Sequence, residues 1–412
     1  MNRSIHHVLF GEIADFRNGL NFGKENRGKG CLLVGVPDFK NNFSPDYGLL
    51  DEINPAGIAK DEDYLKKGDL LFVRSNGNKA LVGRSLYIND DVKALFSGFC
   101  IRARFNSSSI DNRFCAYYTK SKGFKSQLLS SSGTNINNLN QEILSRVEIP
   151  FFPKPEQEKI AAVLSALDVK IDCNNRINAE LEALARTLYD YWFVQFDFPD
   201  ANGKPYRSSG GRMVYNDRLK REIPEGWKNG SLWNIARYFN GLAMQRHRPK
   251  GDDFLPVVKI KEMGEGISAQ TEKASPNIPD DAIINDGDVL FSWSATLDIK
   301  IWSQGKAALN QHIFKVTSEV YPKTFYYFEL LNYLSHFKMM AEKRKTTMGH
   351  ITLDHLKQSK ICIPPTELLW TAHKKMEPIF TKRLLHEKEN QQLTQLRDWL
   401  LPMLMNGQVT VA

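Results

Sequence analysis

The chain has 412 residues, more than one hydrophobic core usually holds, so at least two domains are expected. Hydrophobic residues make up 42% and charged residues 25%, an ordinary globular composition, and no apolar run approaches the roughly 20 residues that span a bilayer. A net charge of +8 favours a polyanionic partner. Because the first residues also lack the apolar run of a signal peptide, we expect a cytoplasmic protein that does not contact a membrane.

The cysteines and histidines do not form a recognisable metal motif. The five cysteines are scattered without a C-x-x-C pair, and the nine histidines show no H-E-x-x-H spacing. We therefore expect reduced thiols, no metal site and no cofactor.

An internal repeat organises the chain. Three segments of the first half recur in the same order in the second half: 13–20 with 235–242, 67–72 with 286–291, and 139–150 with 353–364. The second pair predicts a glycine turn followed by an apolar strand. Three ordered matches indicate a duplicated domain.

After each copy of the third segment the sequence changes to helical period. Heptad seams with alternating steps of three and four are formed by Leu164, Leu167, Ile171, Asn174, Asn178, Leu181, Ala185, Leu188 and Trp192, and by Met376, Ile379, Arg383, His386, Asn390, Leu393, Arg397, Leu400 and Leu404. These two helical segments carry almost none of the excess positive charge. The cationic surface is therefore expected on the globular parts.

Two asparagines, Asn178 and Asn390, occupy the same heptad position in the two seams. A buried pair of asparagine amides would fix the register of the helices at a cost in stability. The alternative is that one or both asparagines face solvent.

The order of these segments predicts an α+β chain with two repeated mixed α/β domains. We expect a first domain at 1–150, a long helix at 151–200, a linker at 201–226, a second domain at 227–360 and a second long helix at 361–412. The linker assignment rests on the Gly, Pro, Ser and charged residues of 201–226.

Catalytic motifs are missing from the sequence. There is no phosphate-binding P-loop and no G-x-S-x-G. The segment Asn54-Pro55-Ala56-Gly57 lacks the second proline and the aromatic residue of an adenine methyltransferase motif, and we interpret it as a turn. Pro37-Asp38 and Pro279-Asp280 lack a nearby acidic-x-Lys element of a nuclease and are ordinary turn dipeptides. We therefore expect a protein without catalytic residues.

Several short motifs resemble the specificity subunits of type I restriction–modification systems, and the resemblance covers nearly the whole chain. They are Ile149-Pro150 followed by Pro155-Glu156-Gln157 before the first heptad helix, and 224–228 (PEGWK) at the start of the second repeat. The second copy departs from the pattern. No counterpart of Glu156-Gln157 stands near Glu367-Leu368, and Pro378 either interrupts the second helix or marks its first turn.

The resemblance implies a non-catalytic protein with two target recognition domains, each reading one half of a bipartite double-stranded DNA target. It implies that the two long helices form an antiparallel coiled coil that spaces the domains. It also implies that these helices dock two methyltransferase subunits, through which motor-nuclease subunits join.

Basic and polar loops supply the candidate DNA contacts, because Arg, Lys and Asn bind phosphates and base edges. The candidates are Lys24, Arg27, Lys29, Arg74, Asn76, Asn78, Lys79, Arg84, Arg246, Arg248, Lys250, Ser292, Ser294, Lys343, Arg344 and Lys345. A solvated polar turn is the alternative for the loop around Arg74 to Lys79, and a charged helix end favoured by the helix dipole is the alternative for Lys343 to Lys345. The aromatic residues at 117–118 and 325–328 are expected to build cores instead of stacking on bases.

Two other classes of protein stay open at this point. One is a DNA methyltransferase or nuclease with diverged motifs, which would transfer methyl groups or cut DNA without partners. The other is a coiled-coil scaffold that does not bind DNA, whose binding would lack the steep salt dependence of phosphate contacts.

Overall fold

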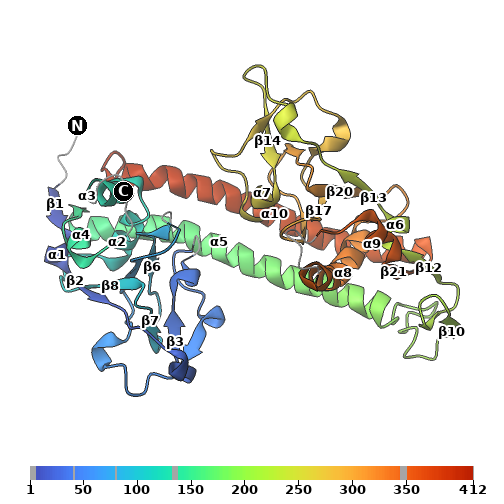
Figure 1. The fold of residues 1–412 in the computed structure, drawn as a ribbon, viewed down its shortest axis with the longest axis horizontal. Helices are drawn as coiled ribbons and strands as arrows, with labels where there is room; N and C mark the ends of the chain where they lie inside the picture. Colours follow the sequence, from blue (N-terminus) through green and yellow to red (C-terminus); the bar gives the residue numbers. More distant parts are fainter. Residues whose placement is uncertain (1–5, 40–41, 79–80, 132–137, 344–349, 412) are drawn as a thin grey trace. The chain divides into compact units, whose positions relative to one another are not determined.

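A computed structural model describes residues 6–39, 42–78, 81–131, 138–343 and 350–411 (Figure 1). The chain divides into two compact units. Unit 1 comprises Met1–Ile171 and Gln392–Ala412, and unit 2 comprises Asp172–Gln391. Each unit contains part of the two long helices, α5 (Lys154–Tyr189) and α10 (Thr366–Met405).

Unit 1 is built on a central sheet with strand order β2-β8-β5-β6, a second sheet β4-β3-β7, and the pair β1-β9. The strands are β1 (His6–Leu9), β2 (Ala14–Asn18), β3 (Arg27–Val34), β4 (Asp51–Ile53), β5 (Leu70–Val73), β6 (Ser85–Tyr87), β7 (Ala94–Phe96), β8 (Cys100–Phe105) and β9 (Glu148–Phe151). The short helices are α1 (Phe10–Ile13), α2 (Asn112–Tyr118), α3 (Lys122–Ser131) and α4 (Gln141–Ser145).

Strand β5 explains how unit 1 is layered. All its residues are buried, although side chains of a strand alternate between two faces. Leu70 and Phe72 enter the core cluster that contains residues of α2, α3 and α5, whereas Leu71 and Val73 enter the cluster that contains residues of β3 and β7. The sheet is therefore covered on both faces, which accounts for the continuous apolar run.

Unit 2 repeats this plan, with a central sheet β13-β20-β17-β18, a second sheet β15-β14-β19-β16, and the pair β12-β21. The strands are β12 (Lys228–Ser231), β13 (Arg237–Asn240), β14 (Leu255–Val258), β15 (Lys273–Ala274), β16 (Ile283–Ile284), β17 (Val289–Ser292), β18 (Asp298–Ile301), β19 (Ala307–Leu309), β20 (Ile313–Thr317) and β21 (Lys360–Ile363). The helices are α6 (Leu232–Ile235), α7 (Ile260–Glu265), α8 (Lys323–Lys343) and α9 (Leu353–Gln358).

The repeated sequence segments occupy equivalent places in the two strand orders. Gly68 and Gly287 both adopt a positive φ, 95° and 88°, directly before β5 and β17. The following aspartates are equally placed, since Ile88 N donates to Asp69 O and Trp302 N donates to Asp288 O. The predicted α+β fold with a repeated mixed domain and two long helices is confirmed.

The long helices are antiparallel where they pair. In unit 1, Leu164 shares a core cluster with Leu401 and Leu404, and the Arg397 guanidinium lies 2.7 Å from an Asp168 carboxylate oxygen. In unit 2, positions 174 to 182 of α5 contact positions 390 to 383 of α10 in descending order. Every residue of the two heptad seams is buried or half-buried.

Asn178 and Asn390 do not pair with each other, although that pairing was one of the two alternatives that the sequence left open. Asn178 Oδ1 lies 2.9 Å from His386 Nδ1, and the Asn178 amide donates to Arg383 O. Asn390 instead accepts a hydrogen bond from Asn174 at 2.9 Å. In an antiparallel pair, equal heptad positions of the two copies do not face each other. The polar layer therefore consists of two related pairs, one Asn–Asn and one Asn–His.

Two further segments differ from expectation. Residues 201–226, predicted as a linker, contain the hairpin of β10 (Met213–Asn216) and β11 (Arg221–Pro224), and Ile223 is buried in the core of unit 2. Pro378 neither starts nor interrupts α10. The helix begins at Thr366 and continues through the exposed Pro378, whose flanking residues Met376 and Phe380 are buried in the same core.

The remaining expectations concern buried groups. The aromatic residues expected in cores are all buried: Tyr117, Tyr118, Phe325, Tyr326, Tyr327 and Phe328. Among the residues that the structure describes, all five cysteines are free thiols, and no three His, Cys, Asp or Glu side chains gather as a metal site. In the described ranges, no helix combines the length and the apolar character that crossing a bilayer requires.

Candidate nucleic-acid interface

In unit 1, four chain segments meet where strands β2 and β5 end; we call them the loop cluster of unit 1. Gly19 N donates to Cys100 O at 3.1 Å, and Arg74 N donates to Phe99 O at 2.8 Å. Leu139 N donates to Arg74 O at 2.8 Å. These bonds join the segments after β2, after β5, before β8 and before α4.

The same backbone frame forms the loop cluster of unit 2. Gly241 N donates to Ile313 O at 3.1 Å, Trp293 N to His312 O at 3.3 Å, and Ile351 N to Trp293 O at 2.8 Å. Arg74 and Trp293 are therefore equivalent positions, as are Phe99 and His312.

The shared Asn-Gly sequence has a steric cause in this frame. A Cβ at Gly19 would lie 2.2 Å from Ser97 O, and one at Gly241 would lie 2.3 Å from Asn310 O. Only glycine permits this close approach of two backbones. The preceding Asn18 and Asn240 are exposed and are held at the same place in each unit.

The side chains in the two frames differ. In unit 1, Arg74 is half-buried, its guanidinium makes no hydrogen bond or ion pair with a described residue, and Phe99 is 58% exposed. In unit 2, the Trp293 indole N–H donates to Asn240 Oδ1 at 2.9 Å. The His312 ring lies 5.6 Å from the Trp293 ring, and its buried Nδ1 has no hydrogen-bond partner within the described part of the chain.

The predicted contact residues of unit 1 are spread over three segments. Lys29 is exposed on β3. Asn76 Oδ1 accepts from Asn78 N at 2.7 Å and so shapes the turn after Arg74. Arg84 is half-buried and donates to Phe39 O at 3.4 Å. Lys79 and the side chains of Lys24 and Arg27 lie outside the described residues.

In unit 2, three predicted cations follow the Asn240-Gly241 turn. Arg246, Arg248 and Lys250 are exposed, and none forms an ion pair with a described residue. Arg248 adds to the lowering of the Glu272 pKa, which is mainly caused by Lys259. Arg344, Lys345 and the side chain of Lys343 lie outside the described residues.

The structure buries two of the predicted contact residues, Ser292 and Ser294. Ser292 is 0% exposed, and its hydroxyl donates to Thr296 O and accepts from Asp298 N. Ser294 is 5% exposed. Ser292 ends β17 and Ser294 lies in the tight connection to β18, whereas the intervening Trp293 is half-buried.

The sequence did not single out Trp293, Phe99, His312 or the two asparagines at 18 and 240. The repeated Asn-Gly was the available signal, since it fixes where equivalent loops begin. The pairing of Trp293 with Asn240 depends on contacts across strands and leaves no sequence pattern.

Acidic residues near the turns serve the fold. Asp38 Oδ2 accepts from Gly35 N at 2.7 Å, and Asp281 pairs with Arg237 at 2.8 Å. Burial tends to raise the pKa of Asp63, but hydrogen bonds from Lys60 N and from Arg17 hold that pKa below its usual value. These carboxylates are occupied by protein partners, which agrees with their interpretation as turn residues.

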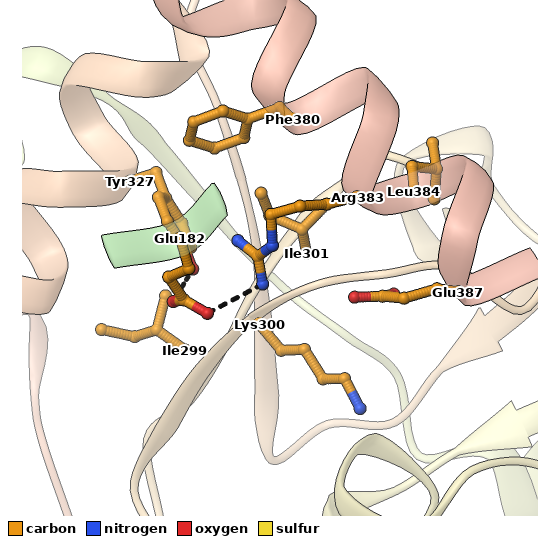
Figure 2. Close-up of a pocket in the computed structure, with 9 residues that line it drawn as sticks. All are labelled: Glu182, Ile299, Lys300, Ile301, Tyr327, Phe380, Arg383, Leu384 and Glu387. Carbon is orange, nitrogen blue, oxygen red and sulfur yellow. Dashed lines mark hydrogen bonds and ion pairs between the residues drawn. The ribbon is translucent and has the colours of Figure 1, made fainter. Parts of the chain in front are cut away.

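Unit 2 also contains a pocket of about 160 Å³ between α5, β18, α8 and α10 (Figure 2). Two carboxylates, Glu182 and Glu387, line it beside two cations, Lys300 and Arg383. Arg383 forms an ion pair with Glu182 at 2.9 Å, and Lys300 donates to Met263 O at 3.0 Å. The pocket therefore has no excess of positive charge to attract a phosphate, and the loop clusters remain the stronger candidates for nucleic-acid contact.

Comparisons with known proteins show the family of the chain. The chain matches the family described as "Type I restriction modification DNA specificity domain" over residues 8–183 and 224–395. It is 27% identical over 316 residues to the type I restriction enzyme MjaIX specificity subunit of Methanocaldococcus jannaschii, covering 73% of this chain and 69% of that protein. It is 24% identical over 443 aligned positions to the HindI specificity subunit of Haemophilus influenzae, covering 92% and 94%.

A solved structure has the same fold. The type I restriction-modification system S subunit from M. genitalium aligns with a TM-score of 0.54 and 16% identity, covering 98% of this chain and 97% of that chain. At this identity the likeness concerns the fold alone.

Proposed function

Because the chain belongs to the family of type I restriction modification DNA specificity domains, we propose that it reads a bipartite double-stranded DNA target, one half with each unit. As a specificity subunit it supplies recognition, and catalysis belongs to other subunits. The observation that carries the proposal is the repeated loop cluster, in which one backbone frame presents different side chains in the two units.

The charge of the chain supports DNA as the ligand. The net charge is +8, and exposed cations without described ion-pair partners stand beside the loop cluster of unit 2 at Arg246, Arg248 and Lys250. Phosphate contacts of this kind position a protein on the duplex, whereas base-edge contacts specify the sequence. We assign Lys29 in unit 1 the same positioning role.

We further propose that the long helices dock methyltransferase subunits, through which motor-nuclease subunits join. Leu184 on α5 and Leu396 on α10 occupy equivalent positions of the repeat and are 56% and 42% exposed. These two leucines are our candidates for the docking contact, and the family of the chain supports the docking itself. Two equivalent surfaces suit two copies of one partner.

The test is selection of DNA by the protein assembled with its methyltransferase subunits. The library is randomised separately in the two half-sites, and the double variant Arg246→Ala/Arg248→Ala is compared with the unchanged protein. Loss of two phosphate contacts weakens binding to all sequences and lowers the slope of log affinity against log salt by about one for each charge removed. Loss of a base contact relaxes the preference at a position in one half only.

The matched control is Arg212→Ala/Lys220→Ala, which removes two charges from exposed positions of the β10–β11 segment. Its binding and salt slope are expected to stay unchanged. Selection of no sequence by the unchanged assembly, or an equal change of preference in both halves by the double variant, contradicts reading by separate units.

A further inference from the structure

We propose that the position held by Arg74 in unit 1 and by Trp293 in unit 2 is a specificity-determining position, which selects a guanine in one half-site and a thymine in the other. This inference rests on the proposed function. It deepens it by assigning a base to a named side chain in each unit.

The argument begins with the identical backbone frame. Arg74 directly follows β5, and Trp293 directly follows β17. Both N–H groups donate to the loop before the neighbouring strand of the sheet, β8 or β20, and both carbonyls accept from the segment before α4 or α9. Two side chains that leave the same frame start from the same point. The difference between the two loop clusters therefore lies in the side chain and not in the path of the chain.

Arg74 has the chemistry of a guanine reader. A guanidinium presents a planar fork of donors that matches guanine O6 and N7 in the major groove. This guanidinium is not engaged by a described residue, and Arg74 as a whole is half-buried. Partial burial of the residue limits the conformations that the side chain adopts, so less entropy is lost when it binds.

Trp293 cannot read a base through a hydrogen bond. Indole has one donor and no acceptor, and this donor is given to Asn240 Oδ1. What the half-buried Trp293 offers is the apolar surface of its ring, held in place by Asn240 and by the His312 ring 5.6 Å away. Thymine carries the apolar methyl group of the major groove, which makes it the matching base.

Asn240 is a positioning residue in this arrangement. Because the indole is only a donor, the amide must turn its oxygen toward Trp293 and its NH₂ group away from it. Unit 1 has Asn18 at the equivalent place, but Arg74 replaces the indole there. The orientation of the asparagine amide is thus fixed in unit 2, where Trp293 donates to it.

The experiment measures half-site selection by the methyltransferase-assembled protein with Arg74→Lys and with Trp293→Ala. Arg74→Lys keeps the charge and removes the fork, so the preference for guanine at one position of one half-site falls about 10- to 100-fold while total affinity changes little. Trp293→Ala removes the preference for thymine at one position of the other half-site. Arg212→Lys, an exposed arginine on the β10–β11 segment, is the control and leaves both halves unchanged.

A third arm needs no variant and therefore stands even where Trp293→Ala does not assemble. Deoxyuridine, which lacks the methyl group, replaces each thymine of the selected site in turn. Binding of the unchanged protein is expected to fall several-fold at one thymine of the half-site that Arg74→Lys does not affect. Trp293→Phe, which keeps a ring, retains part of this sensitivity.

The outcomes separate this inference from the proposed function. Retained guanine preference in Arg74→Lys, or equal binding to all deoxyuridine-substituted sites, overturns the inference although bipartite selection stands. Selection of no two-part sequence by the unchanged assembly overturns the proposed function itself.

Discussion

The side chain of Gln157 joins the start of α5 to the start of α2 in unit 1. It is 0% exposed, and its Oε1 accepts from Asp111 N at 2.9 Å. Its Nε2 donates to Phe152 O at 2.7 Å and to Ser109 O at 3.1 Å. We predict that Gln157→Ala destabilises unit 1 by about 3–5 kcal/mol, because each lost buried bond costs about 1 kcal/mol or more and a cavity remains.

The isosteric variant Gln157→Glu separates hydrogen bonding from packing. It keeps the shape of the side chain but replaces two N–H donors by an oxygen that faces the carbonyls of Ser109 and Phe152. Its loss of stability is expected to match or exceed that of Gln157→Ala and to grow as the pH rises and the buried carboxyl ionises. The control is Gln395→Ala, on an exposed position of α10, which should change stability by less than about 0.5 kcal/mol.

The assay is thermal and denaturant-induced unfolding of the full chain. For a unit of this size, about 1 kcal/mol shifts Tm by about 2–4 °C, so Gln157→Ala should lower the first transition by roughly 6–20 °C. A Tm of Gln157→Ala within about 2 °C of the unchanged protein would refute the reasoning from buried hydrogen bonds. An equal shift in Gln395→Ala would refute it as well, since exposed and buried glutamines would then be equivalent.

Two further predictions concern a buried carboxyl group and the helix surface. Burial raises the pKa of Glu329 to about 7, although the hydrogen bond that Tyr189 donates to it at 2.5 Å acts in the opposite direction. The contribution of Glu329 to folding stability is therefore complete below its ordinary pKa of 4.5 and is lost as the pH rises through about 7. Glu329→Gln should remove this loss. Above pH 7 its unfolding free energy should exceed that of the unchanged chain by up to about 1.4 kcal/mol per unit of pKa shift. Denaturant titrations from pH 5 to 8 measure this, and a difference between the two proteins that stays constant over that range would contradict the prediction. Leu184→Asp and Leu396→Asp should each reduce co-purification of a methyltransferase subunit. Their Tm should stay within a few degrees of the unchanged protein, because both side chains are exposed. Unchanged assembly of the double variant would show that these positions do not belong to the docking surface.

Much of the fold was predictable because its signals are local. The glycine turns at Gly68 and Gly287 require a positive φ, and apolar strands follow them directly. The heptad spacing in α5 and α10 places the seam residues on one face of each helix, and this face is turned away from solvent. Such patterns depend on residues a few positions apart, so the sequence alone determined the repeat, the order of the elements and the buried faces.

The tertiary structure decided which residues meet. Asn178 and Asn390 share a heptad position, but the antiparallel direction gives them His386 and Asn174 as partners. Ser292 is a polar loop residue by sequence, yet the tight β17–β18 connection turns its hydroxyl inward and leaves Trp293 beside Asn240. Local periodicity fixes which side of an element is apolar. Direction, register and loop closure depend on contacts between residues far apart in the chain, and these set which side chains the loop clusters expose.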